Sequence, residues 1–136
     1  MKISEEQVKK RIRDAGLRAT PQRIQLLRIL METSDHPSAE MLMEMAKDSG
    51  FELSIGTVYN TLESFEDRGL VNRVSDSGDV MRYDAKTGFH IHLVDQENHV
   101  IEDYFDDELE GIIKDHLKGK IPDNFFNKQM YISLFS

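Results

Sequence analysis

Two histidines with one residue between them, His90 and His92, are the residues whose types and spacing best suit chemistry. Asp84 lies six residues before His90, and Asp103 lies eleven residues after His92. On an extended strand alternate side chains share a face, so both imidazoles would lie on one side, about 6–7 Å apart along the strand. Nitrogen and oxygen ligands without sulfur suit ferrous iron, manganese or zinc. An H-x-H pair by itself is more often incidental than a metal site, so its interpretation depends on the rest of the chain.

The composition is that of a globular chain of 136 residues, 39% hydrophobic and 31% charged, which corresponds to one or two small domains. No apolar run approaches the roughly 18 residues of a membrane span, and the charged N-terminus lacks the apolar core of a signal peptide. We therefore expect a cytoplasmic protein with no membrane partner. Cysteine is absent, which excludes disulfides and thiolate zinc sites, so any metal must be bound by His, Asp and Glu.

Charge is distributed unevenly along the chain, whose net charge is −8. Residues 1–28 contain eight Lys or Arg and three acidic residues, a local charge of +5, whereas residues 85–136 contain five basic and ten acidic residues, a local charge of −5. The net charge argues against indiscriminate coating of nucleic acid, but the asymmetry suits a chain whose N-terminal part meets phosphate. A solvated helix face explains the basic residues equally well.

Capping residues and apolar spacing predict four short helices in the first half of the chain. Their N-caps are Ser4, Thr20, Ser38 and Ser54. Pro21 strengthens the second start, because proline suits the first helical position. Residues 70–85 then contain two alternating apolar runs around a polar turn, the pattern of a β-hairpin. Short helices followed by a hairpin predict a winged helix-turn-helix, whose last helix enters the major groove.

The chain beyond Gly88 predicts a small α/β domain with a three-stranded antiparallel sheet and one amphipathic helix. Such a sheet has little core of its own, and a second copy would most easily cover it, so we expect a homodimer. The predicted fold class is therefore α+β. The predicted parts are a winged-helix DNA-binding domain at 1–84, a hinge at 85–88, and a dimerisation and metal-sensing domain at 89–136.

Five motifs in order make the chain resemble the ferric uptake regulator (Fur) superfamily of metal-dependent bacterial repressors over nearly its whole length. The motifs are TPQR at 20–23, HPSAE at 36–40, TVYNTLESFEDRGLV at 57–71, RYD at 82–84 and HIH at 90–92. Each is weak alone, but the five together are specific. TVYN and Asp103 are more similar to the peroxide-responsive repressors than to the iron-uptake regulators, which commonly have Arg after the Tyr and Glu at the corresponding acid.

The resemblance implies a regulatory metal site at the hinge between the two domains. Its ligands would be His36, Asp84, His90, His92 and Asp103. A cation bonded to both domains would fix their relative orientation and, in a dimer, the separation of the two recognition helices. Three nitrogens and two carboxylates favour five- or six-coordinate Fe2+ or Mn2+ over tetrahedral Zn2+. Zn2+ would still bind this site in vitro.

In the peroxide-responsive branch, iron admits peroxide, and oxidation of a ligand histidine releases the metal. The resemblance makes His36 and His90 the oxidation-sensitive candidates, and manganese would give an insensitive repressor. The chain lacks the two C-x-x-C pairs of the family's structural zinc, the first of which would fall near Asp95 and Asn98, so we expect no structural zinc. The residues flanking the H-x-H pair cannot ligate, so one metal per subunit is expected.

The expected partner is double-stranded operator DNA, contacted through the fourth helix. Tyr59 and Asn60 would lie on its exposed face and Thr57 at its start; Asn can pair with adenine, and Tyr can reach a phosphate or a thymine methyl. Arg18 and the basic first helix would lie at the DNA backbone or in an adjacent minor groove. Arg23 either contacts DNA or braces the start of its helix.

These features predict a homodimeric, metal-dependent repressor that responds to peroxide, rather than an enzyme with a small-molecule substrate. An alternative in the same superfamily is a regulator of iron or manganese supply, or one responsive to haem, without peroxide sensing. Haem-responsive members usually carry a run of consecutive histidines, which FHIHL lacks. An iron-dependent oxygenase built on His90, His92 and an acid would need a substrate cavity that so short a sheet does not supply. A winged helix with a vestigial metal site would bind DNA unchanged after His90→Ala.

Overall fold

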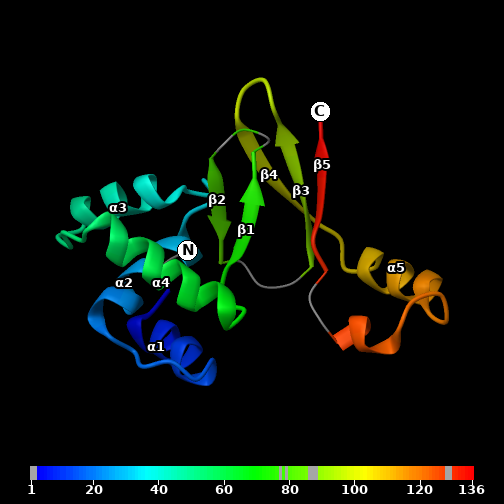
Figure 1. Cartoon of the computed structure of the whole chain (residues 1–136), viewed down its shortest axis with the longest axis horizontal. Coiled ribbons are helices and arrows are strands. Elements are labelled where there is room, and N and C mark those ends of the chain that lie inside the picture. The colour runs from blue at the N-terminus through cyan, green and yellow to red at the C-terminus, as the bar shows by residue number, and fades with distance from the viewer. Residues whose placement is uncertain (1–2, 77, 79, 86–88, 128–129) are drawn as a thin grey trace. The chain divides into compact units, whose positions relative to one another are not determined.

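The computed structural model describes residues 3–76, 78, 80–85, 89–127 and 130–136 (Figure 1). The chain divides into two compact units, which we call unit 1 (Met1–Lys86) and unit 2 (Thr87–Ser136). The predicted hinge at 85–88 lies, apart from Ala85, outside the described residues. None of the helices in the described part of the chain is long and apolar enough to cross a membrane.

Unit 1 contains the four helices that the capping residues predict, followed by a hairpin. Its elements within the described residues are α1 (Glu5–Asp14), α2 (Pro21–Glu32), α3 (Ala39–Asp48), α4 (Ile55–Asp67), β1 (Asn72–Ser75) and β2 (Met81–Asp84). A Ser or Thr at each N-cap accepts a hydrogen bond from the backbone N–H three residues later. Each cap thereby satisfies one of the donors that a first helical turn leaves without an intrahelical partner.

The core of unit 1 is built from one apolar face of each helix. α2 packs on α1 and α3, α3 packs on α4, and β2 contacts both α2 and α3. Its fully buried side chains include Ile12 of α1, Leu27 of α2, Leu42 of α3 and Phe65 of α4. Burial of each such side chain contributes roughly 1.5–3 kcal/mol. The packing holds α4 and the hairpin in one body, and the predicted winged helix-turn-helix is confirmed.

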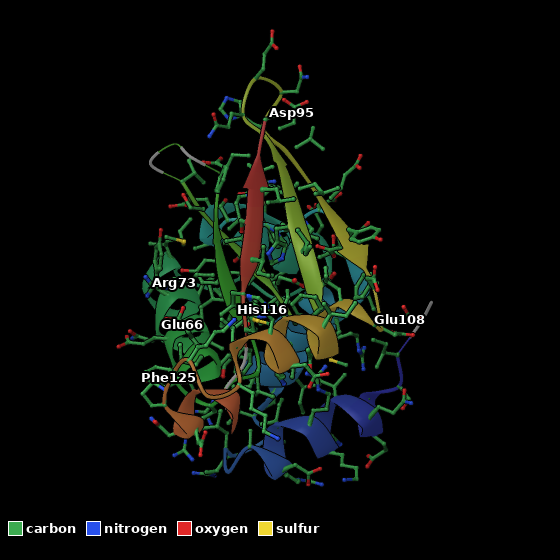
Figure 2. The ribbon with its side chains drawn as sticks, turned by 90° about the vertical axis from the view of Figure 1, so that its right-hand side faces the viewer. Glu66, Arg73, Asp95, Glu108, His116 and Phe125 are labelled. Atoms are coloured by element: carbon green, nitrogen blue, oxygen red, sulfur yellow. The ribbon has the colours of Figure 1, made fainter. Side chains whose placement is uncertain are left out.

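The hairpin of β1 and β2, which we call the wing, is tied to α4. Its strands are antiparallel, with Asn72 opposite Asp84. The Arg73 guanidinium on β1 donates to the Glu66 carboxylate near the end of α4 over 2.5 Å (Figure 2). Asp84, the last residue of β2, therefore lies at the base of the wing.

Unit 2 is a small sheet with helical segments at one end. Its elements, as far as the structure describes them, are β3 (His90–Asp95), β4 (Val100–Phe105), α5 (Leu109–Leu117), a 3-10 helix η1 (Asp123–Asn127) and β5 (Ile132–Phe135). The strand order is β4-β3-β5, and β3 and β4 are antiparallel. This register places His92 directly opposite Asp103.

The last strand corrects one detail of the predicted fold. β5 runs parallel to β3, with Ile91 opposite Ile132, so the expectation of a wholly antiparallel sheet is wrong for this strand. The β3–β4 turn with Asp95 lies at one end of the sheet, whereas His116 of α5 and Phe125 of η1 lie at the other (Figure 2). Because the helical segments stay at the end where β4 finishes and β3 begins, β5 enters from that end and follows the direction of β3.

The β3–β4 turn is closed by the side chain of Asp95. Its Oδ1 accepts from the backbone N–H groups of Glu97 and Asn98 over 3.1 and 3.2 Å, and its Oδ2 accepts from Asn98 Nδ2 over 2.9 Å. These hydrogen bonds, that from the Asn98 side chain first, lower the pKa of the Asp95 carboxyl. Hydrogen bonds therefore hold the turn at which the first C-x-x-C pair of the structural-zinc proteins would fall.

Unit 2 leaves much of its apolar surface exposed. Val94 and Ile101 are buried, but α5 has no buried residue among those described. Large exposed apolar side chains of the unit include Val100, Tyr104, Phe105, Ile112, Leu134 and Phe135. A surface of this kind is the one that a second copy was predicted to cover, and the homodimer stays a prediction.

Candidate metal centre and DNA-binding surface

Three of the five predicted metal ligands come together within unit 2. His90 and His92 share one face of β3, as the strand alternation predicts, and Asp103 projects beside them from β4. The two Nε2 atoms lie 3.1 Å apart, and Asp103 Oδ1 lies 3.7 Å from His90 Nε2 and 3.6 Å from His92 Nε2. The three side chains are only 3–7% exposed. We call these residues the sheet ligand group.

The spacing of the sheet ligand group fits a shared cation. Two ligand atoms bonded to one metal at about 2.1 Å and at right angles to each other lie about 3.0 Å apart. The two Nε2 atoms, 3.1 Å apart, meet this requirement. A hydrogen bond between the rings would also satisfy the contact, with one imidazole as donor and the other as acceptor. The donor set of two imidazoles and one carboxylate is nevertheless that of iron, manganese or zinc rather than of calcium or magnesium.

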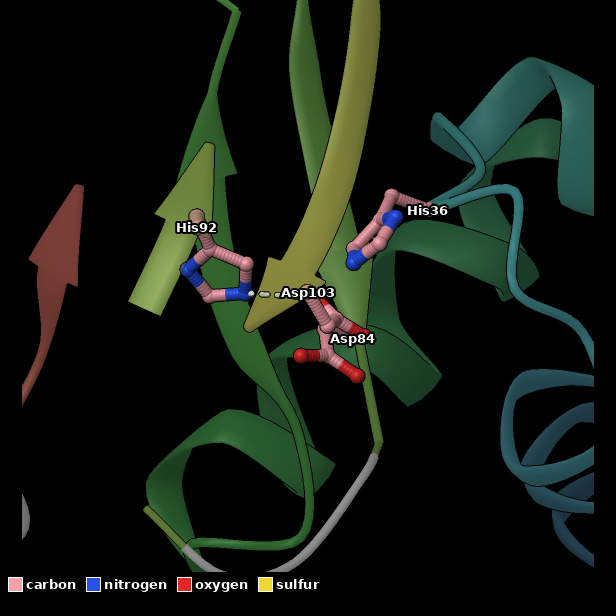
Figure 3. Close-up of side chains that lie close together, drawn as sticks. All are labelled: His36, Asp84, His92 and Asp103. Atoms are coloured by element: carbon pink, nitrogen blue, oxygen red, sulfur yellow. Dashed lines mark ion pairs between the residues drawn. The ribbon is translucent and has the colours of Figure 1, made fainter. Parts of the chain in front are cut away.

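The other two predicted ligands, His36 and Asp84, come together within unit 1. His36 lies in the connection between α2 and α3, and Asp84 ends β2. Each offers a ligand atom, and these two atoms lie within 4.8 Å of each other (Figure 3). The residues are 3% and 4% exposed, respectively. We call this pair the wing ligand group; in the same figure a dashed line marks the separate ion pair of His92 with Asp103.

Residues of β2 hold the loop that carries His36 by donating hydrogen bonds to its main-chain carbonyl oxygens. The Arg82 guanidinium donates through Nε to the carbonyl oxygen of His36 and through Nη2 to that of Asp35, the latter over 2.9 Å. The backbone N–H of Tyr83 donates to the carbonyl oxygen of Pro37, also over 2.9 Å. His36 itself has a φ of +49°, the left-handed region that non-glycine residues seldom adopt. The backbone of the loop that carries His36 is therefore held by β2, which also carries Asp84.

The chain connection limits how far apart the two ligand groups can lie. Asp84 and His90 are separated by five residues, so that the six Cα steps between them span roughly 20 Å when fully extended. The sheet ligand group supplies three donors and the wing ligand group two. Each group by itself leaves positions open on a five- or six-coordinate cation.

The predicted DNA contacts on α4 differ in their surroundings. Tyr59 is 46% exposed, and its hydroxyl donates to Glu40 Oε1 on α3 over 3.0 Å. This hydrogen bond raises the pKa of the Tyr59 phenol. Asn60 is exposed, whereas Thr57 is half-buried with its hydroxyl 2.9 Å from that of Ser54, the N-cap of the helix. Tyr59 and Asn60 are thus presented at the surface, and Thr57 belongs to the cap.

At the start of α2 the structure shows the second of the two roles considered for Arg23, the bracing of its helix. Its Nη1 donates to the backbone carbonyl oxygen of Arg18 over 3.0 Å, so Arg23 braces the helix start. The Arg18 side chain is exposed. Glu40 and Arg82 lie in the HPSAE and RYD motifs, but their roles had no signal in the sequence, because an exposed acid and a side chain that binds main-chain carbonyls have no distinctive spacing.

The sequence also matches a known family. The family model described as "Ferric uptake regulator family" covers residues 14–130. The chain belongs to the ferric uptake regulator family. This membership makes it a metal-responsive, DNA-binding transcriptional regulator, and the fold class and the resemblance predicted from the motifs are confirmed.

Relatives in the ferric uptake regulator family include a ferric uptake regulation protein and a peroxide-responsive repressor. The ferric uptake regulation protein of Bacillus subtilis is 32% identical over 127 residues, which cover 88% of this chain and 85% of that protein. The peroxide-responsive repressor PerR of Staphylococcus aureus is 32% identical over 93 residues, 68% of this chain and 63% of that protein. The structure of the ferric uptake regulator from Pseudomonas aeruginosa with manganese superposes with a TM-score of 0.74 at 26% identity, covering 94% of this chain and 96% of that one. Equal identity to both kinds does not distinguish peroxide sensing from iron or manganese regulation.

Proposed function

We propose that this chain is a homodimeric repressor whose DNA binding requires one Fe2+ or Mn2+ ion per subunit. The observation that carries the proposal is the sheet ligand group, in which two imidazole nitrogens 3.1 Å apart face a nearly buried carboxylate. A donor set of nitrogen and oxygen without sulfur suits these two ions. Zn2+ would bind the same residues in vitro.

We further propose that His36 and Asp84 complete the coordination of the same ion. The wing ligand group supplies two donors at the base of the wing, and the five residues between Asp84 and His90 allow the two groups to meet at one ion. Ligation by both groups would fix the orientation of unit 1 relative to unit 2. In a homodimer this orientation sets the separation of the two α4 helices, which must match the spacing of the operator half-sites.

The homodimer is supported by the exposed apolar surface of unit 2. Leu134 and Phe135 on the edge strand β5 are 55% and 48% exposed, and Phe105 on β4 is 52% exposed. Apolar side chains on edge strands favour pairing with another chain. The proposed DNA contacts are Arg18, Thr57, Tyr59 and Asn60, and the proposed location is the cytoplasm.

Peroxide sensing is the finer part of the proposal. Bound iron would activate hydrogen peroxide, and the two electrons that reduce the peroxide come overall from the imidazole ring, so that the iron ends in its starting oxidation state. Overall, one oxygen atom of peroxide is transferred to the imidazole carbon between the two ring nitrogens of His36 or His90, and the other leaves as water. The oxidised ring is a poorer ligand than neutral imidazole, so the ion is lost and the DNA is released. The longer alignment with the Fur relative, over 88% of this chain against 68% for PerR, favours the second candidate function, a regulator of iron or manganese supply that ignores peroxide.

A metal titration of DNA binding tests the proposal. A duplex selected from a randomised pool by the manganese-loaded protein is titrated with the full chain in Fe2+, Mn2+, Zn2+ or chelator. We expect affinity to be lost in chelator and in His92→Ala, and to be kept in His116→Ala, which removes an exposed histidine of α5. Equal affinity with and without metal would contradict the proposal.

The peroxide arm of the experiment uses mass spectrometry. The iron-loaded protein should gain the mass of one oxygen atom on His36 or His90 after peroxide treatment, and the manganese-loaded protein should not. If the iron form keeps its mass and its DNA affinity, the supply regulator is the correct function.

A further inference from the structure

We propose that Arg82 couples the metal ligand His36 to the wing, so that metal binding orders the wing itself. The inference rests on the proposed function, because it requires a cation at His36. It adds a route inside unit 1 to the reorientation of the two units. Arg82 acts through its neighbours and is therefore a positioning residue rather than a ligand.

The guanidinium of Arg82 has three partners, one for each nitrogen. Nε donates to the His36 carbonyl oxygen, Nη2 donates to the Asp35 carbonyl oxygen over 2.9 Å, and Nη1 lies 3.7 Å from Asp76 Oδ2. The Arg82 side chain is 13% exposed and that of Asp76 is 5% exposed. Because the guanidinium is planar and its nitrogens are fixed relative to one another, it cannot turn toward one partner without losing the others.

Asp76 carries the contact into the turn of the wing. It directly follows β1, and its Oδ1 accepts the backbone N–H of Gly78 over 2.8 Å. The carboxylate therefore binds the turn with one oxygen and faces Arg82 with the other. The contacts run from the backbone of His36 through Arg82 to Asp76 and the turn, and all of them lie within unit 1.

The direction of the effect follows from what a cation would restrain. His36 has a left-handed backbone, and Arg82 holds its loop by donating to the carbonyl oxygens of Asp35 and His36. A cation on the imidazole would restrain His36 from its other side, and the fixed carbonyl would restrain the guanidinium and then Asp76. DNA would then meet a wing whose conformational entropy is already reduced, which makes metal and DNA binding cooperative.

Hydrogen exchange with and without Mn2+ tests this coupling in the absence of DNA. Mass spectrometry of the full chain should show that Mn2+ slows exchange of wing amides, including those of Gly78 and Met81, by about fivefold or more, the lower end of usual coupling factors. Asp76→Asn keeps an acceptor for Gly78 but removes the ion pair, so wing protection by Mn2+ should disappear. Its Mn2+ affinity should fall less than that of Arg82→Gln, because both hydrogen bonds to the carbonyl oxygens of Asp35 and His36 remain.

Arg82→Gln provides the second variant. It removes both carbonyl contacts as well as the ion pair, so Mn2+ affinity should fall by about 10–100-fold, as for other residues that support a ligand. Arg73→Gln is the matched control, because it removes a different ion pair of the wing, that with Glu66, without touching the His36 loop. This control should keep both the Mn2+ affinity and the metal-dependent protection.

The outcomes separate failure of this inference from failure of the proposed function. If the unchanged protein binds no Mn2+, the proposed function is wrong. If it binds Mn2+ but the wing amides exchange at the same rate with and without Mn2+, the proposed coupling is wrong. The coupling is also wrong if Asp76→Asn keeps the protection, and in both cases the proposed metal-dependent repressor is unaffected. Loss of protection in Arg73→Gln would also overturn the coupling. Should Asp76→Asn not fold, Arg82→Gln at saturating Mn2+ still tests the coupling, because it also removes the ion pair and should therefore lose the protection.

Discussion

Replacing His36 by Gly should remove roughly one third to two thirds of the stability that Mn2+ gives to unit 1. The proposed coordination makes His36 and Asp84 the ligands that connect the ion to this unit, so losing the imidazole weakens that connection. Gly is the suitable replacement because it accepts the φ of +49° without strain and adds no ligand atom. The loop can then keep its backbone conformation while the imidazole that would bind the metal is removed.

The size of the effect follows from binding linkage. An ion that binds only the folded state, at a concentration 1,000 times its dissociation constant, stabilises that state by about 4.1 kcal/mol. Unit 1 spans Met1–Lys86, and for a domain of this size each kcal/mol shifts Tm by about 4–8 °C. Mn2+ should therefore raise the Tm of unit 1 by roughly 15–30 °C. A 10–100-fold loss of affinity in His36→Gly would reduce the stabilisation by about 1.4–2.7 kcal/mol.

The assay must report on unit 1 separately from unit 2. Hydrogen-exchange mass spectrometry during heating does so, because peptides from α1–α4 and from β3–β5 are distinct. Each variant is compared with itself in chelator, so the entropic cost of Gly cancels, and His116→Ala serves as the control. If Mn2+ raises the Tm of unit 2 but leaves unit 1 unchanged in the original protein, the ion binds the sheet ligand group alone. Ligation by both groups would then be wrong.

Three further predictions follow from other parts of the structure. Phe65→Ala should lower the free energy of unfolding of unit 1 by about 3–5 kcal/mol, since the ring is fully buried; urea unfolding followed by circular dichroism measures this, and a change below about 1 kcal/mol would contradict the packing. Hydrogen bonds lower the pKa of the Asp95 carboxyl below its ordinary 3.8. Their stabilisation of the β3–β4 turn is therefore complete above pH 3.8, and it is lost as the pH falls through the lower pKa of the folded state. The amides of Glu97 and Asn98 should therefore exchange faster, relative to the intrinsic rate, on acidification, and Asp95→Ala should abolish this pH dependence; if the pH dependence survives in Asp95→Ala, another group holds the turn. Glu40→Ala should return the pKa of Tyr59 toward its ordinary 10.0 in an ultraviolet titration, and its effect on DNA affinity should be non-additive with that of Tyr59→Phe; strictly additive effects would show that Glu40 does not orient Tyr59 on DNA.

Local features of unit 1 were predictable because they depend on neighbours in the chain. Ser4, Thr20, Ser38 and Ser54 cap their helices through the backbone three residues later, so residue type and spacing suffice. The convergence of His90 and His92 follows from strand alternation in the same way. The participation of Asp103 came from the family resemblance, and the antiparallel register of β3 and β4 then gives it a structural basis.

Features that depend on distant partners were not predictable from the sequence. The alternating pattern of residues 132–135 indicates a strand but carries no direction, and the direction of β5 is set by the end of the sheet at which α5 and η1 lie. The role of Arg82 depends on carbonyl oxygens 46 and 47 residues away, and a carbonyl oxygen is the same for every residue type. Glu40 and Tyr59 are 19 residues apart and meet only because α3 packs on α4.

The left-handed backbone of His36 bears on how such a sensor can change in evolution. Gly takes this conformation freely and Asn more readily than most residues, whereas a β-branched residue there would be strained. A descendant with Asn or Gly at this position would keep the loop, the wing and the winged helix while losing the imidazole. A single tolerated substitution would thus leave an intact DNA-binding unit that is connected more weakly to the metal, which makes this position a natural point for regulators of this kind to diverge.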